Sequence, residues 1–349
     1  MNPLALHDFH AARGARFFDL NGHEAVMDYG DWRAEYAALR ETAGLIDLSF
    51  RGRLCALGKD AQKFLHGQVT NHVNGLQIGQ GCYAALVSAK GKMQSDLNIY
   101  RLENEWLLDF EPGLGAVVKE RLEKYVIAEE VEIVDAAAAY GLVRAQGPEA
   151  GAVAEKLGVE LPREPRQIVS VKHAAWGDLY LTKRDGFFEF FVPTAALPDL
   201  AKTLAAPWCG WQALEAARIE DTVPRYGADM DETNLPPEAG LDNRAVSYAK
   251  GCYIGQEVIA RIRTYGQVAK TLRGLTLSSA ALPARGARLW RNDKEVGYIT
   301  SATESPKLKA PIALGYVRRE ANAIGTDLQV EIAGEKVAAR VATLPFEAF

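Results

Sequence analysis

An architectural repeat in the first two thirds of the chain is the feature that most constrains its fold. Apolar periodicity and turn signals predict a first unit in the order strand, helix, three strands, helix and strand, at residues 52–57, 59–65, 82–88, 92–101, 105–110, 114–126 and 131–134. The same order, without the last strand, returns at residues 140–145, 148–157, 168–172, 178–183, 187–192 and 195–204. Two successive units of this order predict a pair of related α+β units.

The rest of the chain has a different pattern. A helix is predicted at residues 210–219, and a connection rich in Gly, Pro, Asn and Asp occupies residues 226–250. Short apolar runs separated by turn residues follow, at residues 272–277, 288–290, 296–300, 312–317, 328–332 and 337–341. They predict a small all-β barrel or sandwich. We therefore expect three domains, at residues 1–137, 138–250 and 251–349, with the 210–219 helix in the second domain or packed against the first.

Composition excludes several classes of protein. With 48% hydrophobic and 24% charged residues, the 349-residue chain is typical of a soluble globular protein. Its net charge of −5 gives no basic field for direct binding to nucleic acid. No apolar run approaches the roughly 18 residues of a membrane span. The four cysteines are scattered and no Cys-x-x-Cys or His-x-x-x-His occurs, so we expect no metal site and reduced thiols in a cytoplasmic protein.

The sharpest local feature is the segment Lys-Gly-Cys-Tyr-Ile-Gly-Gln-Glu at residues 250–257. Cys252 lies beside a glycine, close to Lys250 and just before a predicted helix. A nearby ammonium group and the free N–H groups of a helix start both stabilise a thiolate, which makes Cys252 a candidate functional thiol. A buried, inert cysteine in a packed loop is the alternative.

This segment resembles the signature of the YgfZ family of folate-binding proteins, which are relatives of the glycine-cleavage T-protein, an aminomethyltransferase of the GcvT superfamily. Further segments carry the resemblance along nearly the whole chain, at residues 6–10, 44–49, 60–65, 83–86, 217–220, 235–241, 296–300 and 312–316. The resemblance implies a T-protein-like ring of three domains around a central opening that holds the folate. Two of these domains are related α+β (ferredoxin-like) units and the third is a C-terminal β-barrel, which agrees with the repeat and the terminal strands.

Two carboxylates match folate-site positions of the T-protein. Glu189 corresponds to the glutamate that binds the pterin, whose amino group and ring N–H a carboxylate can accept together. Strand alternation places Glu189 on one face with Phe187 and Phe191, and an outward-facing strand residue is the alternative. Asp96 corresponds to the aspartate near the folate N5 and the reacting amine, where it orients the amine and steadies positive charge. A strand-edge aspartate at a hairpin is its alternative.

The resemblance assigns four further residues to folate binding: Tyr83, Arg218, Glu220 and Lys250. A core tyrosine and an ion pair at a helix end are the alternatives for Tyr83 and for Arg218 with Glu220. The chain also departs from the T-protein pattern. Residues 181–186 lack the glycine and first glutamate of the Tyr-Thr-Gly-Glu-Asp-Gly stretch, and residues 110–112 show no counterpart of its folate-contacting asparagine. Because the T-protein lacks the cysteine signature, these differences favour the YgfZ branch.

The resemblance therefore predicts a tetrahydrofolate-binding protein that acts in assembly or repair of Fe–S cluster enzymes, including those that modify tRNA. Cys252 would be the functional thiol, and its partners would be folate and Fe–S cluster proteins. Without a complete set of cluster ligands, the chain would hold a cluster only transiently with a partner. The alternative is a folate-dependent aminomethyltransferase or demethylase that uses Asp96. A third class is a folate-sensing interaction module without catalysis.

Overall fold

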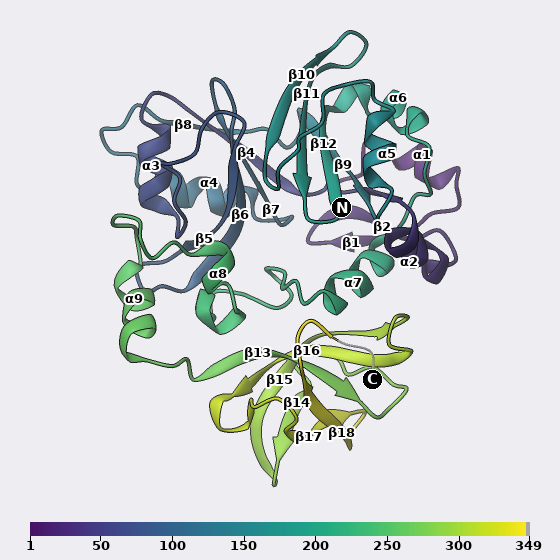
Figure 1. Ribbon diagram of the computed structural model, residues 1–349, viewed down its shortest axis with the longest axis vertical. Coiled ribbons are helices and arrows are strands. Elements are labelled where there is room, and N and C mark those ends of the chain that lie inside the picture. Colours follow the sequence, from purple (N-terminus) through teal and green to yellow (C-terminus); the bar gives the residue numbers. More distant parts are fainter. Residues whose placement is uncertain (347–349) are drawn as a thin grey trace. The chain divides into compact units, whose positions relative to one another are not determined.

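The computed structural model describes residues 1–346 and divides the chain into two compact units (Figure 1). Unit 1 comprises residues 1–86 and 95–214, and unit 2 comprises residues 87–94 and 215 onward. Both predicted α+β units lie in unit 1, and the predicted barrel lies in unit 2. The α+β class of the fold is therefore confirmed, while the three domain boundaries stay a prediction.

The first predicted α+β unit forms a five-stranded sheet, here called sheet I. Its strands follow the order β5 (Gly81–Val87), β6 (Met93–Arg101), β7 (Trp106–Phe110), β4 (Gly52–Leu57) and β8 (Glu132–Asp135). Helices α3 (Ala61–Gln68) and α4 (Gly115–Glu123) pack on one face, where Leu54, Phe64 and Leu122 share a buried core. Because side chains alternate along a strand, Arg53 of β4 points to the opposite face.

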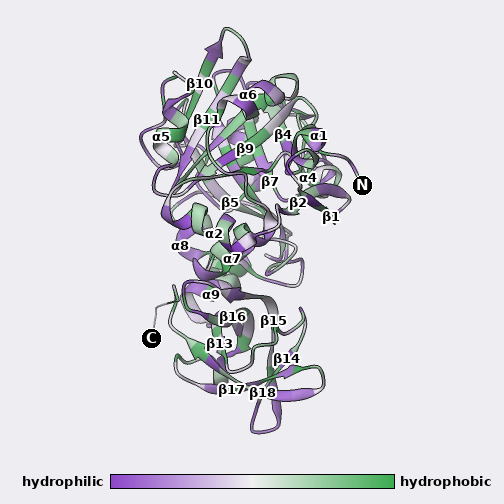
Figure 2. Ribbon diagram, turned by 90° about the vertical axis from the view of Figure 1, so that its right-hand side faces the viewer, coloured by the Kyte–Doolittle hydropathy of each residue, from purple (hydrophilic) through white to green (hydrophobic). Residues whose placement is uncertain are grey.

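The second predicted unit forms sheet II. Its strands follow the order β10 (Ile168–His173), β11 (Gly177–Arg184), β12 (Phe187–Pro193), β9 (Tyr140–Gln146) and β3 (Gly44–Asp47). Helices α5 (Ala150–Glu155) and α6 (Leu197–Thr203) contribute to its core with Phe190 and Leu200. Figure 2 shows hydrophobic and hydrophilic bands alternating along β9, β10 and β11. One face of sheet II is therefore apolar and the other carries polar side chains.

The N-terminal elements were not predicted as secondary structure, except for residues 44–49, which resemble the first strand of the T-protein. They are α1 (His7–Ala11), the hairpin β1 (Arg16–Leu20) and β2 (His23–Asp28), and α2 (Trp32–Glu41). The hairpin turns at Asn21-Gly22, where both residues have positive φ, and this dipeptide is a strong hairpin signal. Asp31 caps α2 by accepting hydrogen bonds from two backbone N–H groups. Both signals were present in the sequence.

Unit 2 contains the C-terminal barrel. Helix α7 (Trp211–Glu220) leads into it, followed by the short helices η2 (Pro236–Ala239) and α8 (Asp242–Ala245), then α9 (Gln256–Tyr265). The closed barrel has the strand order β13 (Lys270–Leu277), β16 (Ala310–Arg318), β15 (Lys294–Ser305), β14 (Arg288–Arg291), β17 (Asp327–Ile332) and β18 (Glu335–Ala342). The short helix η3 (Arg319–Ala321) follows strand β16. Closure decides between the predicted barrel and sandwich, because it pairs β13 with β18 and leaves no sheet edge exposed. Within residues 1–346, no helix is both long and apolar enough to cross a membrane.

Candidate functional site

The polar faces of sheets I and II meet inside unit 1 and form a charged cluster. The Arg184 guanidinium of β11 donates a hydrogen bond to the side-chain oxygen of Asn98 on β6, and the Tyr100 and Phe191 rings lie 6.3 Å apart. Both contacts join the two sheets. We call this group the inter-sheet cluster, and its ionisable and amide members are Arg51, Asp96, Asn98, Asp109, Glu111, Arg144, Arg184 and Glu189.

Glu189 lies at the centre of β12 and is 1% exposed. Strand register places it opposite Arg144 on β9, and that guanidinium donates two hydrogen bonds to Oε1, at 3.1 and 2.6 Å. The guanidinium carbon of Arg144 also lies 3.9 Å from the centroid of the Phe187 ring. Among the described residues, Oε2 of Glu189 has no hydrogen-bond partner. One edge of the carboxylate is therefore held by the protein, and the other remains available to a donor.

The predicted alternation along β12 is confirmed. Phe188 and Phe190 face the apolar core of sheet II, whereas Phe187 and Phe191 share the polar face with Glu189. The carboxylate thus lies between two aromatic rings on one strand face, as the spacing of the phenylalanines predicts.

Arg51 neutralises two other carboxylates of the cluster. Its guanidinium donates to Asp109 at 2.9 and 3.0 Å and to Glu111 at 2.6 Å. Burial opposes the charged forms, yet the ion pairs raise the pKa of Arg51 and lower that of Asp109. Asn98 donates a further hydrogen bond to Asp109 at 2.9 Å. These hydrogen bonds and ion pairs hold the charged side chains of Arg51, Asp109 and Glu111 in place without a ligand.

Asp96 is a member of the inter-sheet cluster that lies on β6. The Tyr83 hydroxyl of β5 donates to Oδ2 at 2.8 Å, while Oδ1 is buried and has no hydrogen-bond partner in residues 1–346. Burial, followed by the negative charge of Glu111, raises the pKa of Asp96 to about 6. Two of the predicted site residues, Tyr83 and Asp96, are therefore in direct contact, and Asp96 exchanges a proton close to neutral pH.

Arg218 and Glu220 are placed elsewhere, within unit 2. Arg218 donates hydrogen bonds to Asp229 at 2.7 Å, to Glu215 at 2.6 and 2.7 Å, and to the Ser301 hydroxyl at 2.9 Å. Glu220 accepts hydrogen bonds from the Ser305 hydroxyl and from a backbone N–H. These contacts join the end of α7 to the barrel, and Arg218 forms its helix-end ion pairs with Glu215 and Asp229. The assignment of both residues to folate stays a prediction.

The signature segment containing Cys252 precedes α9. Cys252 is exposed, whereas Cys55, Cys82 and Cys209 are buried. Lys250 is buried, and its Nζ lies 4.8 Å from the centroid of the Tyr253 ring. Within residues 1–346, no group of three or more His, Cys, Asp or Glu side chains is arranged to hold a metal ion.

The backbone at position 255 explains why the signature segment has a glycine there. Gly255 caps α9 with a φ of +84°, and a Cβ at this position would lie 2.4 Å from the backbone oxygen of Ser88. Only glycine therefore allows the segment to approach the turn between β5 and β6 so closely.

The sequence missed the cationic half of the site. Arg144 lies on a predicted strand, where a charged residue flanked by apolar neighbours was the available signal, and Arg184 directly follows the strand predicted at 178–183. Arg51 precedes a predicted strand and carries no such signal. Its partners Asp109 and Glu111 lie about 60 residues away, and only sheet pairing brings them together.

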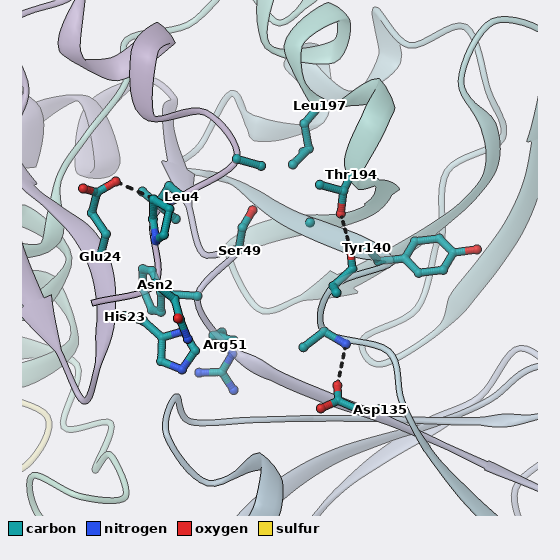
Figure 3. A pocket seen from close by; sticks show the side chains of 16 residues that line it. Asn2, Leu4, His23, Glu24, Ser49, Arg51, Asp135, Tyr140, Thr194 and Leu197 are labelled. Atoms are coloured by element: carbon teal, nitrogen blue, oxygen red, sulfur yellow. Dashed lines mark hydrogen bonds between the residues drawn. The ribbon is translucent and has the colours of Figure 1, made fainter.

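A cavity of about 640 Å³ opens in unit 1 beside the cluster (Figure 3). Figure 3 shows Asn2, Leu4 and His23 on one side of it and Tyr140, Thr194 and Leu197 on the other. Arg51 also lines this cavity while its guanidinium binds Asp109 and Glu111. The cavity thus connects the N-terminal residues Asn2 and Leu4 with Arg51, a member of the inter-sheet cluster.

Comparison with known proteins extends over nearly the whole chain. Residues 6–250 match the GCVT N-terminal domain, and residues 270–347 match the glycine cleavage T-protein C-terminal barrel domain. An aminomethyltransferase of Shouchella clausii is 29% identical, covering 98% of this chain and 96% of the relative. One from Thermosynechococcus vestitus is 30% identical, covering 96% and 93%. The crystal structure of the glycine cleavage system aminomethyltransferase T from Bartonella henselae superposes with a TM-score of 0.92 at 26% identity, covering 99% of this chain and 98% of that one.

Proposed function

Because the chain belongs to the glycine-cleavage T-protein family, we propose that it binds tetrahydrofolate in the inter-sheet cluster and acts as a folate-dependent aminomethyltransferase. One observation carries the proposal. The carboxylates of Asp96 and Glu189 each keep one buried oxygen without a hydrogen-bond partner in the described chain. Buried polar atoms are nearly always paired, so these two oxygens are expected to receive hydrogen bonds from a ligand.

Glu189 supplies the chemistry for holding a pterin. The pterin edge presents an amino group and a ring N–H, and a carboxylate accepts both in a bidentate pair. Arg144 binds Oε1 and thereby fixes the plane of the carboxylate, leaving Oε2 for the ligand. Phe187 and Phe191 lie on the same strand face and favour a flat ring beside the carboxylate.

Asp96 supplies the chemistry for the reacting amine. The Tyr83 hydroxyl holds Oδ2, and Oδ1 is free to accept a hydrogen bond from an amine or to face an iminium carbon. A carboxyl whose pKa is about 6 can carry a proton near neutral pH and lose it when positive charge develops beside it. The Arg51 guanidinium donates a hydrogen bond to Glu111 and so fixes the position of the Glu111 carboxylate near Asp96.

The proposed reaction balances without an external oxidant. An S-aminomethyl thiol loses its C–N and C–S bonds, and its carbon forms two C–N bonds to the folate nitrogens. The two folate N–H protons leave with the departing ammonia and thiol. Asp96 orients the amine during this transfer and offsets the positive charge that passes through the carbon.

Two measurements on matched variants test the proposal. Calorimetry with tetrahydrofolate should show binding to the wild type and to Glu155→Gln, an exposed control, and at least tenfold weaker binding to Glu189→Gln. Methylene-tetrahydrofolate formation from an S-aminomethyl donor should fall at least a hundredfold in Asp96→Asn with folate affinity retained. Absence of folate binding by the wild type would refute the site. Equal turnover by Asp96→Asn would exclude Asp96 from the chemistry.

A second candidate function is favoured by the exposure of Cys252. In this proposal the chain is a cytoplasmic, folate-binding factor that acts in assembly or repair of Fe–S cluster enzymes, including tRNA-modifying ones. The resemblance to the YgfZ family implies this role. Cys252 would act as a thiol that contacts a partner protein, because the three buried cysteines cannot be reached from solvent. Any cluster ligands beyond Cys252 would come from the partner.

Crossed variants separate the two functions. Aminomethyl transfer requires Asp96 and is indifferent to Cys252, whereas a thiol-dependent Fe–S role requires Cys252. Complementation of an Fe–S-enzyme defect by Cys252→Ala, with Asp96→Asn as the matched variant, therefore reports on the second function. Full complementation by Cys252→Ala would remove the thiol from that role. Folate-dependent capture of a partner by both variants would instead indicate a non-catalytic folate-sensing module.

A further inference from the structure

A second cavity, of about 510 Å³, lies within unit 2. Its lining comes from α8, the C-terminal end of α9, the connection to β13, β13 itself and η3, and it includes Arg263, Arg273 and Arg319. We propose that this cavity binds a small organic anion that carries two or more carboxylate or phosphate groups. The inference is independent of the folate site in unit 1, because it uses none of the residues of the inter-sheet cluster.

The three arginines lack carboxylate partners. Among residues 1–346, none of Arg263, Arg273 and Arg319 forms an ion pair, whereas Arg51 and Arg218 each pair with two carboxylates. The half-buried Arg273 donates a single hydrogen bond, from Nε to the Asn322 carbonyl at 2.9 Å, and burial lowers its pKa. Arg263 and Arg319 are exposed, so the cost of an unpaired charge applies to the partly buried Arg273, whose guanidinium is unfavourably placed unless a ligand supplies a counter-charge.

Neighbouring side chains hold the cationic groups in place. The guanidinium carbon of Arg263 lies 4.0 Å from the centroid of the Tyr248 ring, and the Tyr248 hydroxyl donates to Asp242 at 2.6 Å. This chain of contacts fixes Arg263 over the cavity without neutralising it, because a cation–π contact leaves the guanidinium charged. Asp242 is the one carboxylate among the described lining residues, and one of its oxygens is already used.

Net charge and size then define the ligand. Three guanidinium groups against one carboxylate leave the lining cationic, even with the negative end of the α9 dipole nearby. Arginine forks match carboxylate and phosphate oxygens in bidentate geometry. A cavity of 510 Å³ falls in the range of roughly 300–1,000 Å³ typical of small-molecule sites. A single small anion would satisfy only one fork, so at least two acidic groups are needed.

Calorimetry on the full chain tests the site with γ-linked triglutamate and with pyrophosphate, two probes that share anionic oxygens but differ in source. We expect the wild type to bind at least one probe, and Arg263→Ala/Arg319→Ala to bind it about a hundredfold more weakly, since each arginine contributes a charge-assisted contact of about tenfold. Both arginines are exposed, so this double variant is expected to fold. Preference for triglutamate would indicate a polycarboxylate ligand, and preference for pyrophosphate would indicate a phosphate ester.

The matched control is Arg288→Ala/Arg340→Ala on the same barrel. Both of these arginines are exposed and pair with acidic residues, Glu295 and Asp327 respectively. The control should bind the probe as the wild type does. Failure of the wild type to bind either probe would overturn the proposal. An equal loss of binding in the control would overturn it too, because it would reveal non-specific attraction to a cationic surface.

Discussion

Replacing Asp96 by asparagine should make the protein more stable above pH 6 while it removes the carboxyl proposed to act on the substrate. Burial and the charge of Glu111 raise the pKa of Asp96 from 3.8 to about 6. A shift of about two units corresponds to roughly 3 kcal/mol of native-state free energy lost on ionisation. Asparagine keeps the shape and can still accept from the Tyr83 hydroxyl without carrying the charge. We therefore expect the variant to gain about 1–3 kcal/mol at pH 8.

The sign of the pH dependence follows from proton binding. Between pH 4 and pH 6 the native Asp96 holds its proton more tightly than the unfolded chain does, so the free energy of unfolding falls as the pH rises. Below about pH 4 both states are protonated and the contribution is fully present. Above about pH 6 both states are ionised, and the loss is constant. The advantage of Asp96→Asn should therefore grow through this window and then level off.

Urea unfolding followed by tryptophan fluorescence from pH 4 to pH 8 measures this advantage. Infrared difference spectra between the wild type and Asp96→Asn should, in parallel, show a protonated carboxyl band that persists to near pH 6. Glu111→Gln is the matched variant, because removing this charge should move the band to lower pH. An asparagine variant that is less stable at pH 8, or whose advantage does not change with pH, would refute the assigned pKa and its cause.

Three further predictions concern residues whose contacts lie within a single unit, Arg51 in unit 1 and Gly255 and Arg218 in unit 2. Arg51→Met should lower the free energy of unfolding at pH 7 by about 3–5 kcal/mol and by less in acid, where Asp109 becomes protonated, as urea titrations at two pH values would show. Gly255→Ala should cost at least about 2 kcal/mol in the same assay, because φ is +84° and its Cβ meets the Ser88 carbonyl oxygen. Arg218→Met should also cost about 3–5 kcal/mol, since it leaves the buried Asp229 without its cation and Glu215 with Arg225 alone, and unchanged stability would contradict this.

Most elements could be predicted because their signals are local. The strand predicted at 52–57 has the bounds of β4, and the alternation of phenylalanines around Glu189 gives the polar face of β12. The hairpin β1–β2 and helix α2 were missed although Asn21-Gly22 and Asp31 signalled them. The strand at 44–49 was expected, but its partner was not. β3 pairs with β9 in sheet II, nearly a hundred residues away along the chain.

Local patterns in the sequence indicate which residues face together along each strand, because side-chain direction follows from backbone periodicity. They also indicate the cysteine signature at residues 250–257, whereas the exposure of Cys252 is known only from the tertiary structure. Tertiary structure alone decided the partners of the site residues. Strand register joins Arg144 to Glu189, and sheet order brings Arg51 to Glu111. It also turned Arg218 toward the barrel and left Arg273 without a carboxylate. Such pairings depend on contacts between distant segments, and no local pattern encodes which of several buried charges will meet.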